Sequence, residues 1–210
     1  MRISFLLTIV VILQYSSCKQ DEYCEQEYTF SIPNTISPAL DTFHVGDTLW
    51  FTSMISVEMV EKNTGESYDV NNLNFPIAIR FTRLDTEEFV HSINAFDYYN
   101  IVGGIRVDMG LTTHTALLQY ERLEDDTRKC YASIICKEIG DFELGTANLT
   151  EDFENINLTS SDCIEDIFLH YSMNGDTSDN HFYLLSDRPR PVADEAGFKQ
   201  NGGYAFAVIE

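Results

Sequence analysis

The sequence predicts a mainly β protein, an antiparallel β-sandwich that carries one or two short helical insertions. Roughly eight to ten short segments rich in β-branched and aromatic residues alternate with turn signals, which is typical of a sandwich. Helical spacing occurs in only two segments. Hydrophobic residues make up 44% of the chain and aromatic residues 12%, so the chain can build a substantial core. We expect a single β-rich domain over residues 28–210.

Alternation of apolar and polar residues predicts most of the strands. In residues 75–84, for example, Ile77, Ile79 and Phe81 share one face. Residues 124–128, which begin with three acidic residues, lie between two such segments and predict the turn of a hairpin. The last segment is apolar enough to be a central strand. The predicted strands are residues 28–32, 47–54, 75–84, 105–109, 116–123, 129–138, 141–144, 181–185 and 203–209.

Two segments change from alternating to helical spacing. In residues 86–98 a capping box precedes Phe89, Ile93 and Phe96, which recur at helical intervals. Residues 162–171 also place apolar side chains on one helical face. The second segment fits an alternating strand as well, and we favour the helix.

The first 17 residues have the pattern of a secretory signal peptide. Arg2 supplies a positive charge, and residues 5–13 form an apolar run. That run is about half of the roughly 20 residues that a membrane-spanning helix needs. The small residues Ser16 and Ser17 follow it. The alternative is a buried N-terminal strand or helix, but we expect residues 1–17 to be a signal peptide.

The end of this segment resembles the lipobox of bacterial lipoproteins. Ser16 and Ser17 precede Cys18, at the position of the cysteine that becomes the acylated N-terminus in that family. Tyr15 stands where the family prefers leucine, a departure that the looser lipoboxes of the Bacteroidota share. The resemblance implies that Cys18 carries fatty acyl chains such as palmitate.

Lys19-Gln20-Asp21-Glu22 is similar to the tract that follows the cysteine in surface-exported lipoproteins of the same phylum. Any solvated tether would also be polar. The resemblance implies that residues 18–27 are a lipidated tether. It also implies that the protein is anchored in the outer membrane, where it is either surface-exposed or faces the periplasm.

Four further cysteines are available for disulfides in an exported chain. Cys130 and Cys136 would lie about 20 Å apart in one extended strand, too far for a disulfide with each other. We therefore expect one of Cys130 and Cys136 to form a disulfide with Cys163. The other one of these two would form a disulfide with Cys24. A zinc site is the less favoured alternative, because the spacings are not those of paired CxxC motifs.

The net charge and the absence of several known motifs reduce the number of functional classes that fit the sequence. The formal net charge is −21 at pH 7, which is the wrong sign for nucleic acid and for anionic lipid headgroups. It suits solubility near a crowded cell surface. HExxH, GxSxG, Walker and GxGxxG motifs are absent from the sequence. We expect no cofactor.

One loop contains oxygen donors at the close spacing that calcium prefers. Within residues 174–180 the donors are Asp176, Ser178, Asp179 and Asn180. The loop does not match the EF-hand pattern, and a plain turn is the more common use of such residues. The metal content is therefore left open.

Aromatic residues supply the remaining candidates. Tyr98 and Tyr99 precede a glycine pair and predict a binding loop, although packing is the commoner role. Trp50 could stack on a sugar if exposed, but its apolar strand favours a core position. The stretch Val45–Trp50 resembles a strand start in bacterial extracellular immunoglobulin-like domains, which implies that kind of sandwich.

Three functions fit these observations. The first is a non-catalytic lipoprotein of the cell envelope with a binding or structural role, whose partners would be other envelope proteins or glycans. The second is a subunit of a surface fibre or nutrient-uptake complex, which would leave a sheet edge open. The third is a surface hydrolase, which would need a cleft that holds two carboxylates or a histidine beside a nucleophile. We favour the first.

Overall fold

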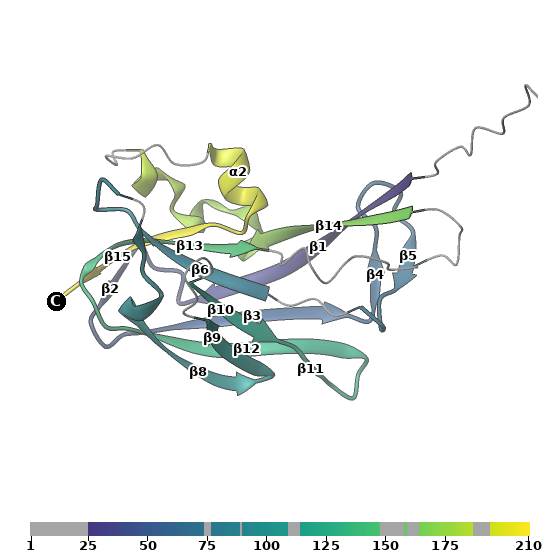
Figure 1. Cartoon of the computed structure of the whole chain (residues 1–210), viewed down its shortest axis with the longest axis horizontal. Helices are drawn as coiled ribbons and strands as arrows, with labels where there is room; N and C mark the ends of the chain where they lie inside the picture. Colours follow the sequence, from purple (N-terminus) through teal and green to yellow (C-terminus); the bar gives the residue numbers. More distant parts are fainter. Residues whose placement is uncertain are drawn as a thin grey trace, which may run out of the picture.

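The fold is a β-sandwich in which two sheets pack face to face (Figure 1). The mainly β architecture predicted from the sequence is confirmed. The predicted signal peptide, Cys18, most of the predicted tether, Cys24 and Cys163 lie outside the described residues. The computed structural model describes residues 25–73, 77–88, 90–108, 114–147, 158, 164–186 and 194–210.

The first sheet, which we call sheet A, has six strands. Their order is β11-β12-β3-β1-β14, and β8 lies beside β12 on the same side as β11. The β1–β14 pair is parallel, and the other pairs in sheet A are antiparallel. The strands are β1 (Glu25–Ser37), β3 (Thr48–Ser56), β8 (Phe96–Val102), β11 (Glu121–Arg122), β12 (Thr127–Cys136) and β14 (Ile164–Met173).

The second sheet, sheet B, has seven strands in the order β2-β15-β13-β6-β10-β9, with β7 beside β6. The β2–β15 pair is parallel. As predicted, the last strand is central, because β2 and β13 flank β15. The strands are β2 (Thr42–His44), β6 (Ile77–Arg83), β7 (Val90–His91), β9 (Gly104–Asp108), β10 (Thr115–Gln119), β13 (Gly140–Ala147) and β15 (Tyr204–Ile209).

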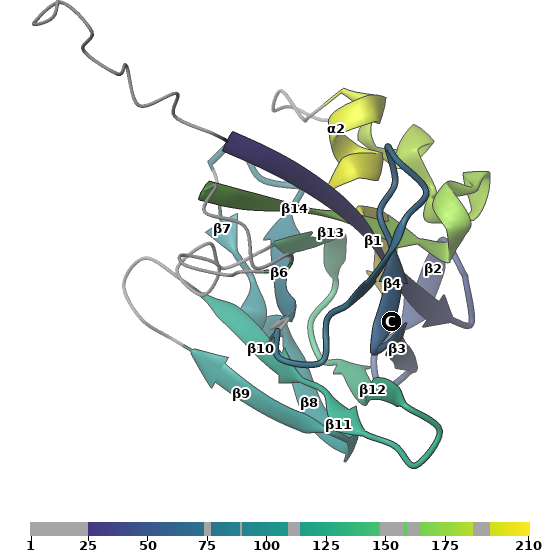
Figure 2. The same cartoon turned by 90° about the vertical axis from the view of Figure 1, so that its right-hand side faces the viewer.

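Short elements complete the fold. The α-helix begins where the Asp194 carboxylate caps it by accepting a hydrogen bond from the Gly197 N–H at 2.8 Å, and it packs against β14 (Figure 2). None of the described helices has the length and apolarity that crossing a membrane requires. These elements are the hairpin strands β4 (Glu58–Val60) and β5 (Ser67–Asp69), the 3-10 helices η1 (Ile93–Ala95), η3 (Asn174–Asp176), η4 (Ser178–Asn180) and η5 (Phe182–Leu185), and the helix α2 (Glu195–Gln200).

The core lies between the two sheets and is rich in aromatic rings. Phe96 of sheet A stacks on Phe81 of sheet B, with ring centroids 4.1 Å apart. Phe142 and Phe206 of sheet B complete the cluster, and all four side chains are buried. Burial of apolar area at about 25 cal/mol per Å² is the main force that holds the two sheets together.

Neither predicted helix forms. Residues 86–98 instead contain β7, η1 and the start of β8. Phe96 and Tyr98 pair with β12 opposite Cys136 and Ile134, and this ladder satisfies the backbone better than a marginal short helix would. Residues 162–171 contribute most of β14, where ten register pairs with β1 decide the conformation. The alternating-strand alternative was the correct one.

The end of the chain also differs from the expectation. The strand predicted over residues 181–185 is wrong, because these residues form η5. His181 has a left-handed φ of 58° and lies between the 3-10 helices η4 and η5, so the backbone is not extended there. Helix α2 was not predicted, because its single turn and a half is too short to show helical periodicity.

A buried carboxylate holds the start of β1. Glu61, which follows β4, accepts hydrogen bonds from the backbone N–H groups of Thr29, Asn63 and Thr64 at 2.9, 2.9 and 2.6 Å. Burial raises the pKa of Glu61, but these hydrogen bonds outweigh burial and lower the pKa to about 2. The ionised form therefore stabilises the junction between β1 and the β4–β5 hairpin.

We expect Glu61→Gln to lower the melting temperature by several degrees at pH 7. The pKa is lowered on folding, so the contribution is complete above the ordinary value of 4.5 and is lost as the pH falls towards 2. Thermal melts of the wild type and the variant should therefore converge across that interval. Glu58→Gln, an exposed change on the neighbouring strand, should leave the melting temperature unchanged. A pH-independent difference would contradict the assignment.

Candidate functional site

The outer face of sheet A carries an exposed group of aromatic and apolar side chains. Strand β3 buries Leu49 and Phe51, so Trp50 and Met54 point to the opposite, outer side. Trp50 is partly exposed and Met54 is 51% exposed. The expectation that Trp50 lies in the core is therefore wrong. Because Leu49, Trp50 and Phe51 are all apolar, the sequence does not show which alternate positions of the strand face the core.

Two neighbouring strands extend this group. On β12, Tyr131 lies against Trp50 with ring centroids 5.5 Å apart at 36°. On β8, Tyr99 and Ile101 are 54% and 50% exposed. Ser133 of β12 connects the two sides, because it is the register partner of both Trp50 and Tyr99. We call Trp50, Met54, Tyr99, Ile101 and Tyr131 the aromatic face.

Polar groups border the aromatic face. Ser37 of β1 is the register partner of Trp50, and Thr35 is the partner of Thr52. Both β1 side chains are exposed. The Lys129 ammonium group lies over the Tyr131 ring, 5.2 Å from its centroid. The face therefore combines flat rings with hydroxyl groups that can donate and accept hydrogen bonds.

The aromatic face lies at one end of the domain. Strand β1 begins at Glu25, whereas Trp50 pairs with Ser37 at the other end of the same strand. At about 3.3 Å per residue, the two ends of this 13-residue strand are roughly 40 Å apart. The aromatic face therefore lies far from the start of β1.

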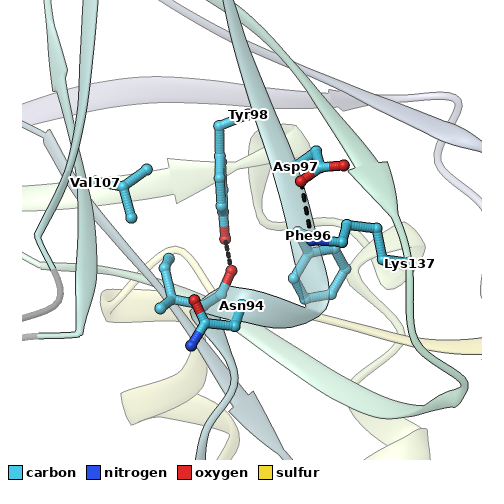
Figure 3. Close-up of a pocket in the computed structure, with 7 residues that line it drawn as sticks. Asn94, Phe96, Asp97, Tyr98, Val107 and Lys137 are labelled. Atoms are coloured by element: carbon cyan, nitrogen blue, oxygen red, sulfur yellow. Dashed lines mark hydrogen bonds and ion pairs between the residues drawn. The ribbon is translucent and has the colours of Figure 1, made fainter.

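A pocket of about 570 Å³ opens between η1, β8 and β9, at the edge where the two sheets meet (Figure 3). The Tyr98 hydroxyl donates to the Ile93 carbonyl at 2.9 Å and stands beside Val107. Burial raises the pKa of Tyr98, so this hydroxyl stays protonated. At the rim, Lys137 Nζ lies 3.0 Å from an Asp97 carboxylate oxygen.

The described residues that line the pocket do not include the constellation that a hydrolase needs. Its described lining contains one carboxylate, that of Asp97, which is held by Lys137. Retaining or inverting glycosidases need two carboxylates, and the residues described around the pocket include neither a histidine nor a serine or cysteine nucleophile. The pocket can hold a small apolar group, but its described residues do not form a catalytic set.

The two tyrosines singled out in the sequence do not lie in a loop. Both belong to β8, and the alternation of the strand sends them to opposite faces of sheet A. Tyr98 lines the pocket and Tyr99 belongs to the aromatic face. The prediction of a binding loop is wrong in its geometry, because pairing with β12 extends the segment.

The acidic loop is held by its own hydrogen bonds. The Asn180 amide is buried, donates to the Met173 carbonyl at 2.7 Å and accepts from the Asn174 amide at 3.1 Å. Asp176 pairs with His170 at 3.3 Å, while Ser178 and Asp179 are exposed. In the described part of the chain, no group of three or more histidine, cysteine or acidic residues could hold a metal ion. These contacts account for the conformation of the loop.

Cys130 and Cys136 are free thiols in the core. The expectation that one of them pairs with Cys163 and the other with Cys24 is therefore wrong for both. Burial raises the pKa of each thiol to about 12, so neither forms a reactive thiolate near neutral pH. Both side chains act as small apolar groups on the inner face of β12.

Comparison with known proteins gives fold-level likeness only. No protein-family model and no curated protein match the chain. The human F-spondin reeler domain is similar over 73% of this chain and 92% of its own, with 11% identity and a TM-score of 0.33. A chain of the CaDoc0917–CaCohA2 complex is similar over 70% of this chain and 99% of its own, with 11% identity and a TM-score of 0.29. These TM-scores are too low to indicate what this chain binds.

Proposed function

We propose that the protein is a non-catalytic lipoprotein of the cell envelope, anchored in the outer membrane through Cys18, whose aromatic face binds a neutral glycan. The observation that carries this proposal is the position of the aromatic face on the outer side of sheet A, at the end far from the tether. An anchored domain of this form presents its binding surface away from the membrane.

The chemistry of the face favours a glycan. Sugar rings offer a flat apolar side of C–H groups, which suits the Trp50 and Tyr131 rings. Hydroxyl groups at the sugar's edge suit the hydroxyls of Ser37 and Thr52 beside them. The chain charge of −21 repels acidic polysaccharides, so a neutral one fits better.

We expect Trp50→Ala to weaken glycan binding by about tenfold or more, which corresponds to ~1.4 kcal/mol. The measurement is affinity electrophoresis of the soluble chain, from Lys19 onward, in gels that contain glucan, mannan, galactan or an acidic polysaccharide. Phe168→Ala is the matched control, because Phe168 is an exposed aromatic residue of sheet A that pairs with Thr29 near the tether.

Two outcomes would overturn the glycan assignment. One is equal retardation of the wild type and Trp50→Ala in a gel that retards both. The other is the absence of retardation in all of the gels. A matching loss in both the Trp50 and the Phe168 variants would indicate a structural effect, not a contact with the sugar.

One observation favours a second candidate, a subunit of a surface fibre or uptake complex. Strand β9 ends sheet B, and its described residues pair with β10 alone. An open edge of this kind can accept a strand from another chain. Light scattering distinguishes the two functions: concentration-dependent assembly that Val107→Lys abolishes would favour the subunit, because an edge lysine blocks strand pairing.

A further inference from the structure

One row of side chains crosses the aromatic face from strand to strand. Trp50 of β3 and Tyr99 of β8 are both register partners of Ser133 on β12, so these three residues lie in one line on the same face. Ser37 of β1, the register partner of Trp50, extends the line on the other side. We propose that this cross-strand row binds several consecutive sugars of a single extended, linear polysaccharide chain. The proposal rests on the proposed function and adds to it the form of the glycan.

The row contains two separate stacking surfaces. The first is Trp50 with the Tyr131 ring beside it, and the second is Tyr99, whose side chain is 54% exposed. Neighbouring strands are about 4.7–4.9 Å apart, so Trp50 and Tyr99, which are two strands apart, are separated by roughly 10 Å at the backbone. One sugar ring does not span this separation. Two or more linked sugars can contact both surfaces at once.

The position between the two stacking surfaces is small and polar. Ser133 lies on the outer face of sheet A, yet it is only 6% exposed, which is the expected result for a short side chain between two large ones. A sugar chain can therefore pass over Ser133 without a steric obstacle. Ser37, which is exposed at the end of the row, offers a hydroxyl group for a hydrogen bond.

The arrangement of the rings determines the direction of the bound chain. Among the described residues, the strands β3, β12 and β8 each present one aromatic ring to the outer face, those of Trp50, Tyr131 and Tyr99. The outer positions that follow Trp50 along β3 are Thr52 and Met54, which carry no ring. A glycan that ran along one strand would therefore contact one ring. A glycan that crosses the strands contacts all three.

The twist of the sheet favours a single chain over the surface of a crystalline polysaccharide. Neighbouring strands rotate by roughly 20–25°, so β3 and β8, with β12 between them, differ by about 40–50° in direction. The Trp50 and Tyr131 rings already differ by 36°. A crystalline surface is planar and would contact one stacking surface at a time. A single chain can rotate about its glycosidic bonds and follow both.

A series of oligosaccharides of increasing length tests the proposal. The soluble chain, from Lys19 onward, is titrated in a calorimeter with the mono-, di-, tetra- and hexasaccharide of whichever polysaccharide retards it in the gels. We expect the affinity to rise by about tenfold or more between the disaccharide and the tetrasaccharide, because the longer chain reaches Tyr99. A monosaccharide that binds as tightly as the tetrasaccharide would overturn the proposal. Retention on an insoluble crystalline form without affinity for the soluble tetrasaccharide would also overturn it.

The variant Tyr99→Ala identifies the second stacking surface. It should lose the gain in affinity with length, so that its affinities for the disaccharide and the tetrasaccharide become similar. The matched control is Tyr183→Ala, because Tyr183 is a tyrosine of η5 that is 56% exposed and lies beside sheet B, and it should keep the gain. An undiminished gain in Tyr99→Ala would contradict the assignment. Binding that does not depend on length would overturn the cross-strand row alone, whereas the absence of binding to every glycan would overturn the proposed function itself.

Discussion

Cys18→Ala should abolish acylation and, with it, permanent membrane attachment. Each buried CH₂ group stabilises attachment by about 0.8 kcal/mol, and a single acyl chain holds a protein only marginally. A lipoprotein cysteine carries two or three chains, so the wild type should be found almost entirely in the membrane fraction. Intact mass spectrometry of the wild type should show a chain that begins at Cys18 and carries fatty acyl groups, which the variant lacks.

The control must separate the lipid from the apolar signal segment. An uncleaved Cys18→Ala chain would still carry the apolar run over residues 5–13, which can itself hold it at a membrane. A second variant therefore replaces residues 1–18 with an ordinary cleavable signal peptide, and it should be recovered as a soluble protein. A wild-type chain that begins at another residue, or that carries no acyl group, would refute the envelope assignment.

The local patterns that could be predicted from the sequence are those in which one face of a strand is clearly apolar. In β6, Ile77, Ile79 and Phe81 share one face and are buried as expected, although Ala78 on the other face is buried as well. Tyr28 and Ile32 mark the inner face of β1 in the same way. Such strands carry their burial pattern in a period of two, which needs no knowledge of the partner strand.

What could not be predicted depends on contacts between distant parts of the chain. Residues 162–171 fit a helix and a strand almost equally, and the parallel pairing with β1 decides between them. Nothing local indicates that Ile164 becomes the neighbour of Glu25. The same holds for the candidate site, because Trp50, Tyr99 and Tyr131 meet only through the pairing of three strands.

The sequence also does not indicate which side chains point into the core where several apolar residues are consecutive. Leu49, Trp50 and Phe51 give no alternation, so the apolar run by itself favours a core position for Trp50. In the structure the smaller neighbours are buried and the indole is on the outer face. A large aromatic residue that remains partly exposed on a flat sheet is more informative about function than a buried one, because its contact area is available to a partner.

Phe206→Ala should be the most destabilising of the single changes proposed for this fold, with a loss of about 3–5 kcal/mol of unfolding free energy. The side chain is buried in β15, opposite Phe142 in the register. Its ring centroid lies 5.5 Å from that of Phe43 and 6.0 Å from that of Phe96, so it contacts both sheets. Removing it leaves a cavity that rigid neighbouring rings cannot fill.

Urea unfolding of the soluble chain, followed by intrinsic fluorescence, measures this loss. Ile209→Ala is the matched control, because Ile209 belongs to the same strand but is 42% exposed at its end. It should cost less than about 1 kcal/mol. Comparable losses in the two variants would mean that the Phe206 ring is not central to the packing. A large loss at Phe206 with glycan binding unchanged would show that the inner face of the sandwich supports the fold while the outer face of sheet A serves recognition.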